Sequence, residues 1–235
     1  MVEFEHIEIG YKTPLLRVDQ LKLEEGSLYS LIGKNGVGKS TFLQSILNLT
    51  APLSGKIRIN GVNTQSCSPK ALAGLVAFVP SKFDGVQHLS AEDYVLMGRA
   101  PYTSFTGRYS DQDKRVVDEV FRQMNIGHLR HKETLKMSDG ERQIASIAKA
   151  LVQQTPLILL DEPTAFLDYS NRMSILSLLK EIAVTNKKCI LQSSHDLDLC
   201  IDYSDTLLVV SDEVIYRHDR DSFDKEALIR QAYSR

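Results

Sequence analysis

The fold is decided by the stretch GKNGVGKST, which runs from Gly33 to Thr41. It matches the pattern G-x-x-x-x-G-K-[ST], with an apolar strand pattern (SLYSLI) before it and an apolar helix pattern (TFLQSIL) after it. Glycines let backbone N–H groups point at a phosphate without a Cβ in the way, and the start of the helix adds its positive dipole end. We therefore predict a P-loop in which Lys39 reaches the β- and γ-phosphates and Ser40 holds Mg²⁺. The expected phosphate-binding residues are Gly33, Asn35, Gly36, Gly38, Lys39, Ser40 and Thr41.

A second element of the same chemistry is an apolar run, Leu157 to Leu160, that ends in two acids. Acids at a strand end are more often simply solvated, but a P-loop earlier in the chain favours a catalytic interpretation. The carboxyl ends of strands form the edge at which open α/β sheets bind ligands. We expect Asp161 to contact Mg²⁺ through water and Glu162 to act as the general base that deprotonates the attacking water.

Strand and helix patterns alternate along the rest of the chain, without repeats. Apolar residues recur at helical spacing between Ser90 and Gln153, which predicts a helical insertion at about 88–153. Together these patterns predict an α/β fold with a mostly parallel sheet and one insertion, in a single domain over residues 1–235. The expected strands are 4–9, 16–23, 27–32, 56–60, 77–79, 157–160, 188–192, 206–210 and 213–216; the expected helices outside the insertion begin near 39 and cover 171–184, 196–200 and 224–233.

Composition excludes several other classes of protein. The 235 residues carry a net charge of −2, so the surface as a whole does not attract nucleic acid. No apolar run approaches the roughly 20 residues of a membrane helix, and the N-terminus MVEFEHIEIG lacks the basic start of a signal peptide. The three cysteines form no C-x-x-C pair, which predicts ordinary thiols in a reducing compartment. We expect a cytoplasmic protein that reaches a membrane only through a partner.

A third candidate element is the segment Ser138-Asp139-Gly140-Glu141-Arg142-Gln143. Ser138 and Glu141 form S-x-x-E, a capping box, ahead of apolar residues at helical spacing. The start of that helix is expected to offer the unsatisfied N–H groups of Ser138 and Gly140 to an anion. In isolation this pattern indicates only an ordinary helix cap.

In combination these segments resemble the ATPase domains of ABC transporters, from Tyr11 to His195 in the family's order. The 138–143 segment resembles the signature motif of the family, and Ala165-Phe166-Leu167-Asp168 resembles the D-loop after the acidic pair. His195, after the strand KKCILQSS, resembles the switch histidine. The P-loop alone would indicate only a large nucleotide-binding superfamily, and a lone tyrosine or histidine is more often structural.

The resemblance implies roles for these residues. Tyr11 stacks on the adenine ring, and His195 holds the γ-phosphate and the attacking water. Ser138 and Gly140 contact the γ-phosphate held by a second copy of the chain, and Asp168 of the D-loop is among the nucleotide-binding residues. The resemblance also implies an ABC ATPase core with an antiparallel β subdomain, ATP and Mg²⁺ as ligands, and a head-to-tail homodimer. The implied partners are an integral-membrane permease on whose cytoplasmic face the protein sits, and indirectly an external substrate-binding protein.

Two positions depart from the family pattern. Ser81 stands where a glutamine usually follows the strand that ends at Pro80, and a serine reaches Mg²⁺ only through an intervening water. Gln87 is nearby, but the ungapped register aligns Ser81, which leaves the coupling chemistry at this position open. Asp139 and Glu141 replace glycine and glutamine in the signature, and the Asp139 carboxylate would repel a γ-phosphate unless its side chain points away.

The insertion carries the segments Met97-Gly98-Arg99-Ala100-Pro101-Tyr102 and Gly107-Arg108-Tyr109-Ser110. This G-R-x-P-Y plus G-R-x-S pattern resembles the ATPases of importers for iron–siderophore complexes, haem and cobalamin. A soluble ABC ATPase, such as one for iron–sulfur-cluster assembly, shares every catalytic motif and is the alternative. The helical insertion argues against an exporter. A nucleic-acid-associated ABC protein would carry a coiled-coil insertion or tandem domains, and a nucleotide kinase leaves the signature unexplained.

Overall fold

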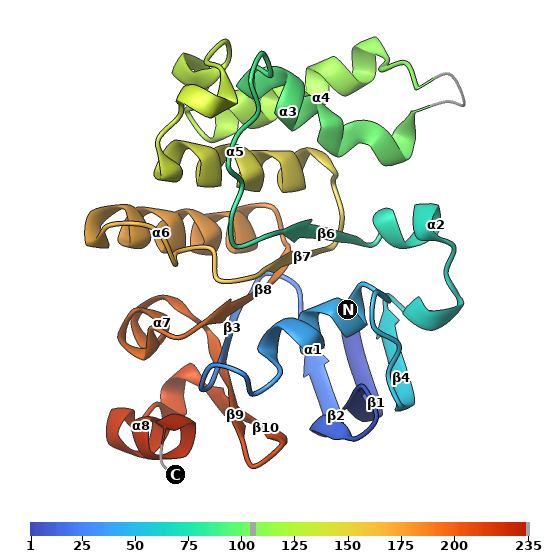
Figure 1. Ribbon diagram of the computed structural model, residues 1–235, viewed down its shortest axis with the longest axis vertical. Helices are drawn as coiled ribbons and strands as arrows, with labels where there is room; N and C mark the ends of the chain where they lie inside the picture. Colours follow the sequence, from blue (N-terminus) through green and yellow to red (C-terminus); the bar gives the residue numbers. More distant parts are fainter. Residues whose placement is uncertain (104–106, 234–235) are drawn as a thin grey trace.

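The computed structural model describes residues 1–103 and 107–233. Ten strands form one sheet in the order β5-β4-β1-β2-β10-β9-β3-β8-β7-β6 (Figure 1). Five neighbouring strands, from β9 to β6, run parallel to one another. Their continuous apolar runs are almost entirely buried, which is typical of parallel strands covered on both faces. These strands are β3 (Leu28–Ile32), β6 (Val76–Val79), β7 (Leu157–Leu160), β8 (Cys189–Ser194) and β9 (Thr206–Ser211).

The other half of the sheet is antiparallel. Strand β1 pairs with both β2 and β4, and β4 pairs with β5. Strand β10 pairs antiparallel with β9 and contacts β2 through the parallel pair Val214 and Arg17, so the two halves form one sheet. The predicted antiparallel subdomain and final strand pair are confirmed, whereas their union through β10 was not predicted. The antiparallel strands are β1 (Val2–Gly10), β2 (Pro14–Leu23), β4 (Ser54–Ile59), β5 (Val62–Asn63) and β10 (Val214–Asp219).

Helices cover both faces of the sheet. The expected helix after the P-loop is α1 (Lys39–Ile46), and the later ones are α6 (Tyr169–Thr185), α7 (Leu197–Tyr203) and α8 (Lys225–Tyr233). A short helix that was not predicted, α2 (Pro69–Ala73), precedes β6. Helices α1, α5, α6 and α7 all begin towards the left side of Figure 1, where the parallel strands end. Elements that start at this edge can bring their first residues to one site.

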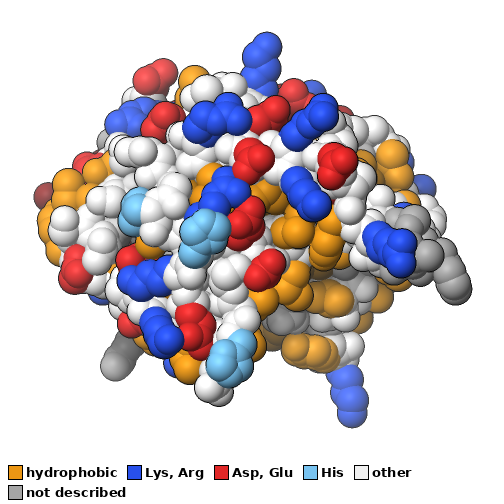
Figure 2. All heavy atoms as spheres, turned by 90° about the horizontal axis from the view of Figure 1, so that it is seen from above, with side chains coloured by type: hydrophobic (Ala, Val, Ile, Leu, Met, Phe, Trp, Pro, Cys, Tyr) orange, Lys and Arg blue, Asp and Glu red, His pale blue; other side chains and the backbone are white. Residues whose placement is uncertain are grey.

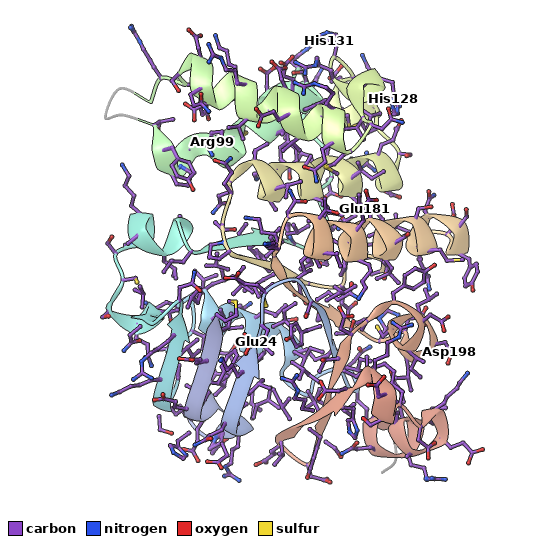
Figure 3. All side chains as sticks on the ribbon, turned by 180° about the vertical axis from the view of Figure 1, so that it is seen from behind. Glu24, Arg99, His128, His131, Glu181 and Asp198 are labelled. Carbon is purple, nitrogen blue, oxygen red and sulfur yellow. The ribbon has the colours of Figure 1, made fainter. Side chains whose placement is uncertain are left out.

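The helical insertion lies at one end of the molecule (Figure 1). It contains α3 (Ala91–Leu96), a 3₁₀ segment (Met97–Tyr102), α4 (Asp111–Gln123) and α5 (Asp139–Val152). The Arg99 guanidinium, labelled in Figure 3, forms a buried ion pair of 2.9 Å with Asp113 and donates to the carbonyl of Val152 at 2.8 Å. Because a buried charge is costly without partners, this pairing fixes the 3₁₀ segment between the start of α4 and the end of α5. Within the described residues, no helix has the length and apolar character to cross a bilayer.

Candidate functional site

The loop between β3 and α1 has the geometry of a phosphate cradle. Gly36 and Gly38 have φ angles of 83° and 100°, a backbone conformation that residues other than glycine rarely adopt. A Cβ on Gly38 would also lie 3.3 Å from Leu16 of β2. These glycines therefore allow the backbone to turn sharply just before α1, and the N–H groups of the first turn of α1 have no acceptor within the helix.

Lys39, the first residue of α1, is enclosed by this loop. Its side chain is only 6% exposed, and its ammonium donates to the carbonyls of Gly33 (2.7 Å) and Lys34 (3.0 Å). Burial lowers the pKa of Lys39, and the nearby carboxylates of Glu162 and Asp161 oppose that shift. The cradle thus holds a buried cation whose acceptors are neutral carbonyls, and a polyphosphate would be a better partner for it.

Ser40 and Asp161 come together as a pair of oxygen ligands. The Ser40 hydroxyl, on α1, donates to Oδ1 of Asp161 at 3.2 Å, across 121 positions of sequence. Mg²⁺ prefers hydroxyl, carboxylate and water oxygens in this kind of nucleotide site. The residues therefore fit Mg²⁺, with Ser40 able to ligate the ion directly and Asp161 to hold it through water.

Ser193, on β8, is a site residue that the sequence analysis missed. Its fully buried hydroxyl donates to Oδ1 of Asp161 at 2.6 Å and accepts the backbone N–H of Glu162 at 2.9 Å. Glu162 has a φ of 46°, which is an uncommon conformation for a residue other than glycine. One hydroxyl on the neighbouring strand therefore holds the carboxylate of Asp161 and the backbone of Glu162. The only sequence feature that could have indicated this role is the pair of serines before His195, and two adjacent serines do not show which residues their hydroxyls contact.

His195 lies beside the expected general base. Its Nδ1 is 3.5 Å from Oε2 of Glu162, and their side chains are 50% and 29% exposed. Both residues follow parallel strands, β8 and β7, which explains why they meet at the same edge of the sheet. An imidazole and a carboxylate at this separation can both form hydrogen bonds to one water molecule.

The Ser193→Ala variant is expected to hydrolyse ATP about tenfold to hundredfold more slowly, since a lost buried hydrogen bond with an unpaired partner costs about 1–3 kcal/mol. The variant loses the bonds that orient Asp161 and Glu162, so kcat should fall more than KM rises. Steady-state hydrolysis rates over a range of ATP concentrations measure both effects. The matched control is Ser30→Ala, a buried serine of β3 whose hydroxyl pairs with Ser204 at 2.6 Å. Equal losses in both variants would contradict a specific role for Ser193.

The predicted capping box is present at the start of α5. The Ser138 hydroxyl accepts the N–H of Glu141 at 3.2 Å, and the Glu141 carboxylate accepts the N–H of Ser138 at 2.8 Å. The expectation of an unsatisfied N–H at Ser138 is therefore wrong, because Glu141 reaches back to it. The hydrogen-bond donors that remain available to an anion here are the hydroxyl of Ser138 and the backbone N–H of Gly140 in the first turn. Lys132 is bonded to Glu141 and holds the pKa of that carboxyl below its usual range.

The two acidic departures in the signature segment are both neutralised by neighbours. The Asp139 carboxylate forms an ion pair with Arg142, one turn further along α5. Arg142 also donates to the carbonyl of Met137 at 2.7 Å. The start of α5 lies against the start of α6, since a Cβ on Gly140 would lie 3.4 Å from Asn171. The added acids therefore do not leave this helix start with free negative charge.

Tyr11 and Asp168 lie at the margins of the site. The Tyr11 side chain is 70% exposed in the turn between β1 and β2, where its ring faces are open to a ligand. That turn is tight, because a Cβ on Gly10 would lie 2.1 Å from the carbonyl oxygen of Thr13. Asp168 caps α6, and both of its carboxylate oxygens accept hydrogen bonds from Asn171. Among residues 1–103 and 107–233, no hydrogen bond or ion pair joins either residue to the cluster around Asp161.

Ser81 lies after β6, in a small cavity between the start of α5 and the loop that follows Glu162. The cavity has a volume of about 20 Å³, room for one water molecule. Gln143 also lines it, and its buried amide nitrogen has no hydrogen-bond partner among the described residues. A water bridge is the way in which a residue as short as Ser81 could act here.

The chain is similar to known proteins over most of its length. The family model described as "ABC transporter" matches residues 16–165. The petrobactin import ATP-binding protein of Bacillus anthracis is 31% identical over 99% of this chain and 86% of its own length. The achromobactin transport ATP-binding protein of Dickeya dadantii is 34% identical over 92% of this chain and 78% of its own length.

Solved structures show the same fold. An inward-facing transporter described as metal-chelate type has a chain that matches with a TM-score of 0.86 and 25% identity, over 99% of this chain and 88% of that one. A dimeric ATP-binding cassette bound to ADP and phosphate matches with a TM-score of 0.78 over 95% of this chain and 100% of that one. Because the identity to the second structure is only 24%, that similarity shows the fold alone.

Proposed function

Since this chain belongs to the ABC transporter family and is an ATP-hydrolysing subunit of that kind, we propose that it powers a membrane permease through ATP-dependent closure of a head-to-tail homodimer. The observation that supports this proposal most directly is the hydrogen-bonded chain Ser40–Asp161–Ser193–Glu162 beside the buried Lys39. Phosphoryl transfer to water needs a cation, oxygen ligands for a metal and a base close together, and these side chains would meet that need at one edge of the sheet.

In the proposed reaction, Lys39 exchanges its carbonyl acceptors for oxygens of the β- and γ-phosphates. Water attacks the γ-phosphorus, the bond to the β–γ bridging oxygen breaks, and the water proton passes to Glu162, giving ADP and phosphate. His195 holds the water and the γ-phosphate. Mg²⁺, when bound by Ser40 and through water by Asp161, supplies charge neutralisation on the phosphates.

The second half of each site comes from the partner chain. Figure 1 shows the start of α5 and the P-loop at different heights on the same side of the molecule, with the start of α6 between them. A second copy in the opposite orientation then brings its Ser138 hydroxyl and Gly140 N–H to the γ-phosphate, with Asp168 and the D-loop at the interface. ATP contacts both chains only in the closed state, so binding favours closure and hydrolysis reverses it.

The cargo class that we propose is an iron chelate, haem or cobalamin, taken up through an importer at the cytoplasmic face of the membrane. The names of the two relatives above and the metal-chelate type of the solved transporter support this choice. The permease would dock on the helical end, where Figure 2 shows mixed charges with apolar side chains at the flanks. Exposed apolar residues of that end include Val86, Met97 and Tyr102.

Binding to source membranes tests the permease assignment. The protein should rebind saturably to membranes stripped of peripheral proteins by urea, and should bind far less to liposomes of the extracted lipids. Met97→Glu should weaken rebinding at least about tenfold, because it places a charge in a desolvated contact. The matched control is Tyr216→Glu on β10, since Tyr216 is 40% exposed and Met97 is 48% exposed. Rebinding no better than to liposomes would reject a permease partner and favour the soluble type of ABC ATPase.

A further inference from the structure

Helix α8 packs against the segment that carries His195. Its apolar side, Leu228 and Ala232, is buried in a small core with residues of β9 and α7, including Leu197 and Cys200. Lys225, at the start of α8, forms a 2.7 Å ion pair with Asp198, which Figure 3 labels at the start of α7 above α8. Helix α8 is therefore fixed at both ends relative to the turn between β8 and α7.

The last described turn of α8 reaches this turn directly. The hydroxyl of Tyr233 donates to the backbone carbonyl of His195 at 2.8 Å, across 38 positions of sequence. The hydroxyl is protonated near neutral pH and so can donate, and burial raises its pKa further. Both residues also line a groove of about 350 Å³. Tyr233 is thus a tether on the peptide group of His195 from an element outside the nucleotide site.

Few other contacts hold the His195 side chain. It is 50% exposed, and its 3.5 Å approach to Glu162 is longer than a strong hydrogen bond. The next residue, Asp196, is anchored by its N–H to the Ser194 hydroxyl at 3.1 Å and by Arg172 at 3.5 Å. The Asp196 N–H and the His195 carbonyl belong to one peptide group, which is therefore held by Ser194 on its N–H side and by Tyr233 on its carbonyl side.

We propose that α8 positions the switch histidine, and that Tyr233 is a positioning residue for ATP hydrolysis. The proposal rests on the hydrolytic role of His195 put forward above. Without the Tyr233 hydroxyl this peptide keeps only its bond to Ser194, so the backbone of His195 gains freedom to shift the imidazole relative to Glu162. Small misplacements of catalytic groups are costly in rate. In the proposed site the P-loop makes most of the phosphate contacts and His195 contacts only the γ-phosphate, so the effect should lie mainly in kcat.

The test is Tyr233→Phe, which removes the hydroxyl and keeps the ring. We expect kcat for ATP hydrolysis to fall about fivefold, in line with one lost hydrogen bond, while KM for ATP and the thermal midpoint stay as in the unmodified protein. Tyr216→Phe, at an exposed tyrosine of β10, is the matched control and should change neither constant. An unchanged kcat in Tyr233→Phe, or a fall in thermal midpoint that accounts for the lost rate, would overturn the proposal.

A double-variant cycle separates positioning from a general effect. In a His195→Ala background, with slow turnover followed over hours by release of labelled phosphate, Tyr233→Phe should cost nothing further. The same fivefold loss in that background would show that Tyr233 acts on something other than His195. Failure of the proposed function is distinguishable, because His195→Ala would then hydrolyse ATP at the unmodified rate.

Discussion

Glu162→Gln is expected to slow ATP hydrolysis by about 10²–10⁴-fold, the usual contribution of a positioned general base. The amide keeps the size of the side chain but cannot take the proton of the attacking water. Its backbone N–H still donates to Ser193, so the geometry around Asp161 should persist. Steady-state phosphate release measures the loss, and ATP affinity should remain close to that of the unmodified protein.

The same variant should accumulate as a dimer in the presence of ATP, because closure occurs and the step that reopens it does not. Size-exclusion chromatography with and without ATP reports the shift. The control adds Ser138→Arg, which places a bulky cation where the partner's phosphate would dock. A monomer throughout would contradict closure without the permease, and a dimer that survives Ser138→Arg would contradict the head-to-tail arrangement.

Lys39→Ala is expected to weaken ATP binding by about 10²–10³-fold, because truncating one partner of a buried charge pair costs about 2–5 kcal/mol. Among the described residues, the P-loop has no other buried ammonium group that could bind the phosphates of ATP. Lys39 is also already desolvated before ATP binds. Equilibrium titration with ATP and Mg²⁺ measures the affinity, and circular dichroism checks the fold.

The control for this variant is Lys56→Ala, at an exposed lysine on β4 away from the P-loop. It removes the same charge from the protein without touching the cradle. A comparable loss of affinity in both variants would show that net charge, and not the cradle, governs ATP binding. Retention of full affinity in Lys39→Ala would contradict the phosphate-binding role of this lysine.

Local patterns made much of this protein predictable from sequence. The P-loop, the acidic pair after β7 and the capping box at Ser138 are runs of neighbouring residues, whose backbone preferences and hydrogen bonds act over three or four positions. Strands such as β7 and helices such as α6 were found because apolar periodicity reports which faces are buried. Local errors were the missed helix α2 and the free N–H expected at Ser138, which the Glu141 carboxylate of the same box already accepts.

Contacts between distant elements were decided only by the tertiary structure. The Ser193 hydroxyl meets Asp161 and Glu162 because β8 lies beside β7, and Tyr233 meets His195 because α8 packs over α7 and β9. The two halves of the sheet are likewise joined because β10 pairs with β9 on one side and with β2 on the other. Such pairings follow from packing and strand order. The sequence around a serine or tyrosine does not indicate which distant residue its side chain contacts. The sequence by itself therefore determined the chemistry available to this protein, and packing determined which side chains hold that chemistry in place.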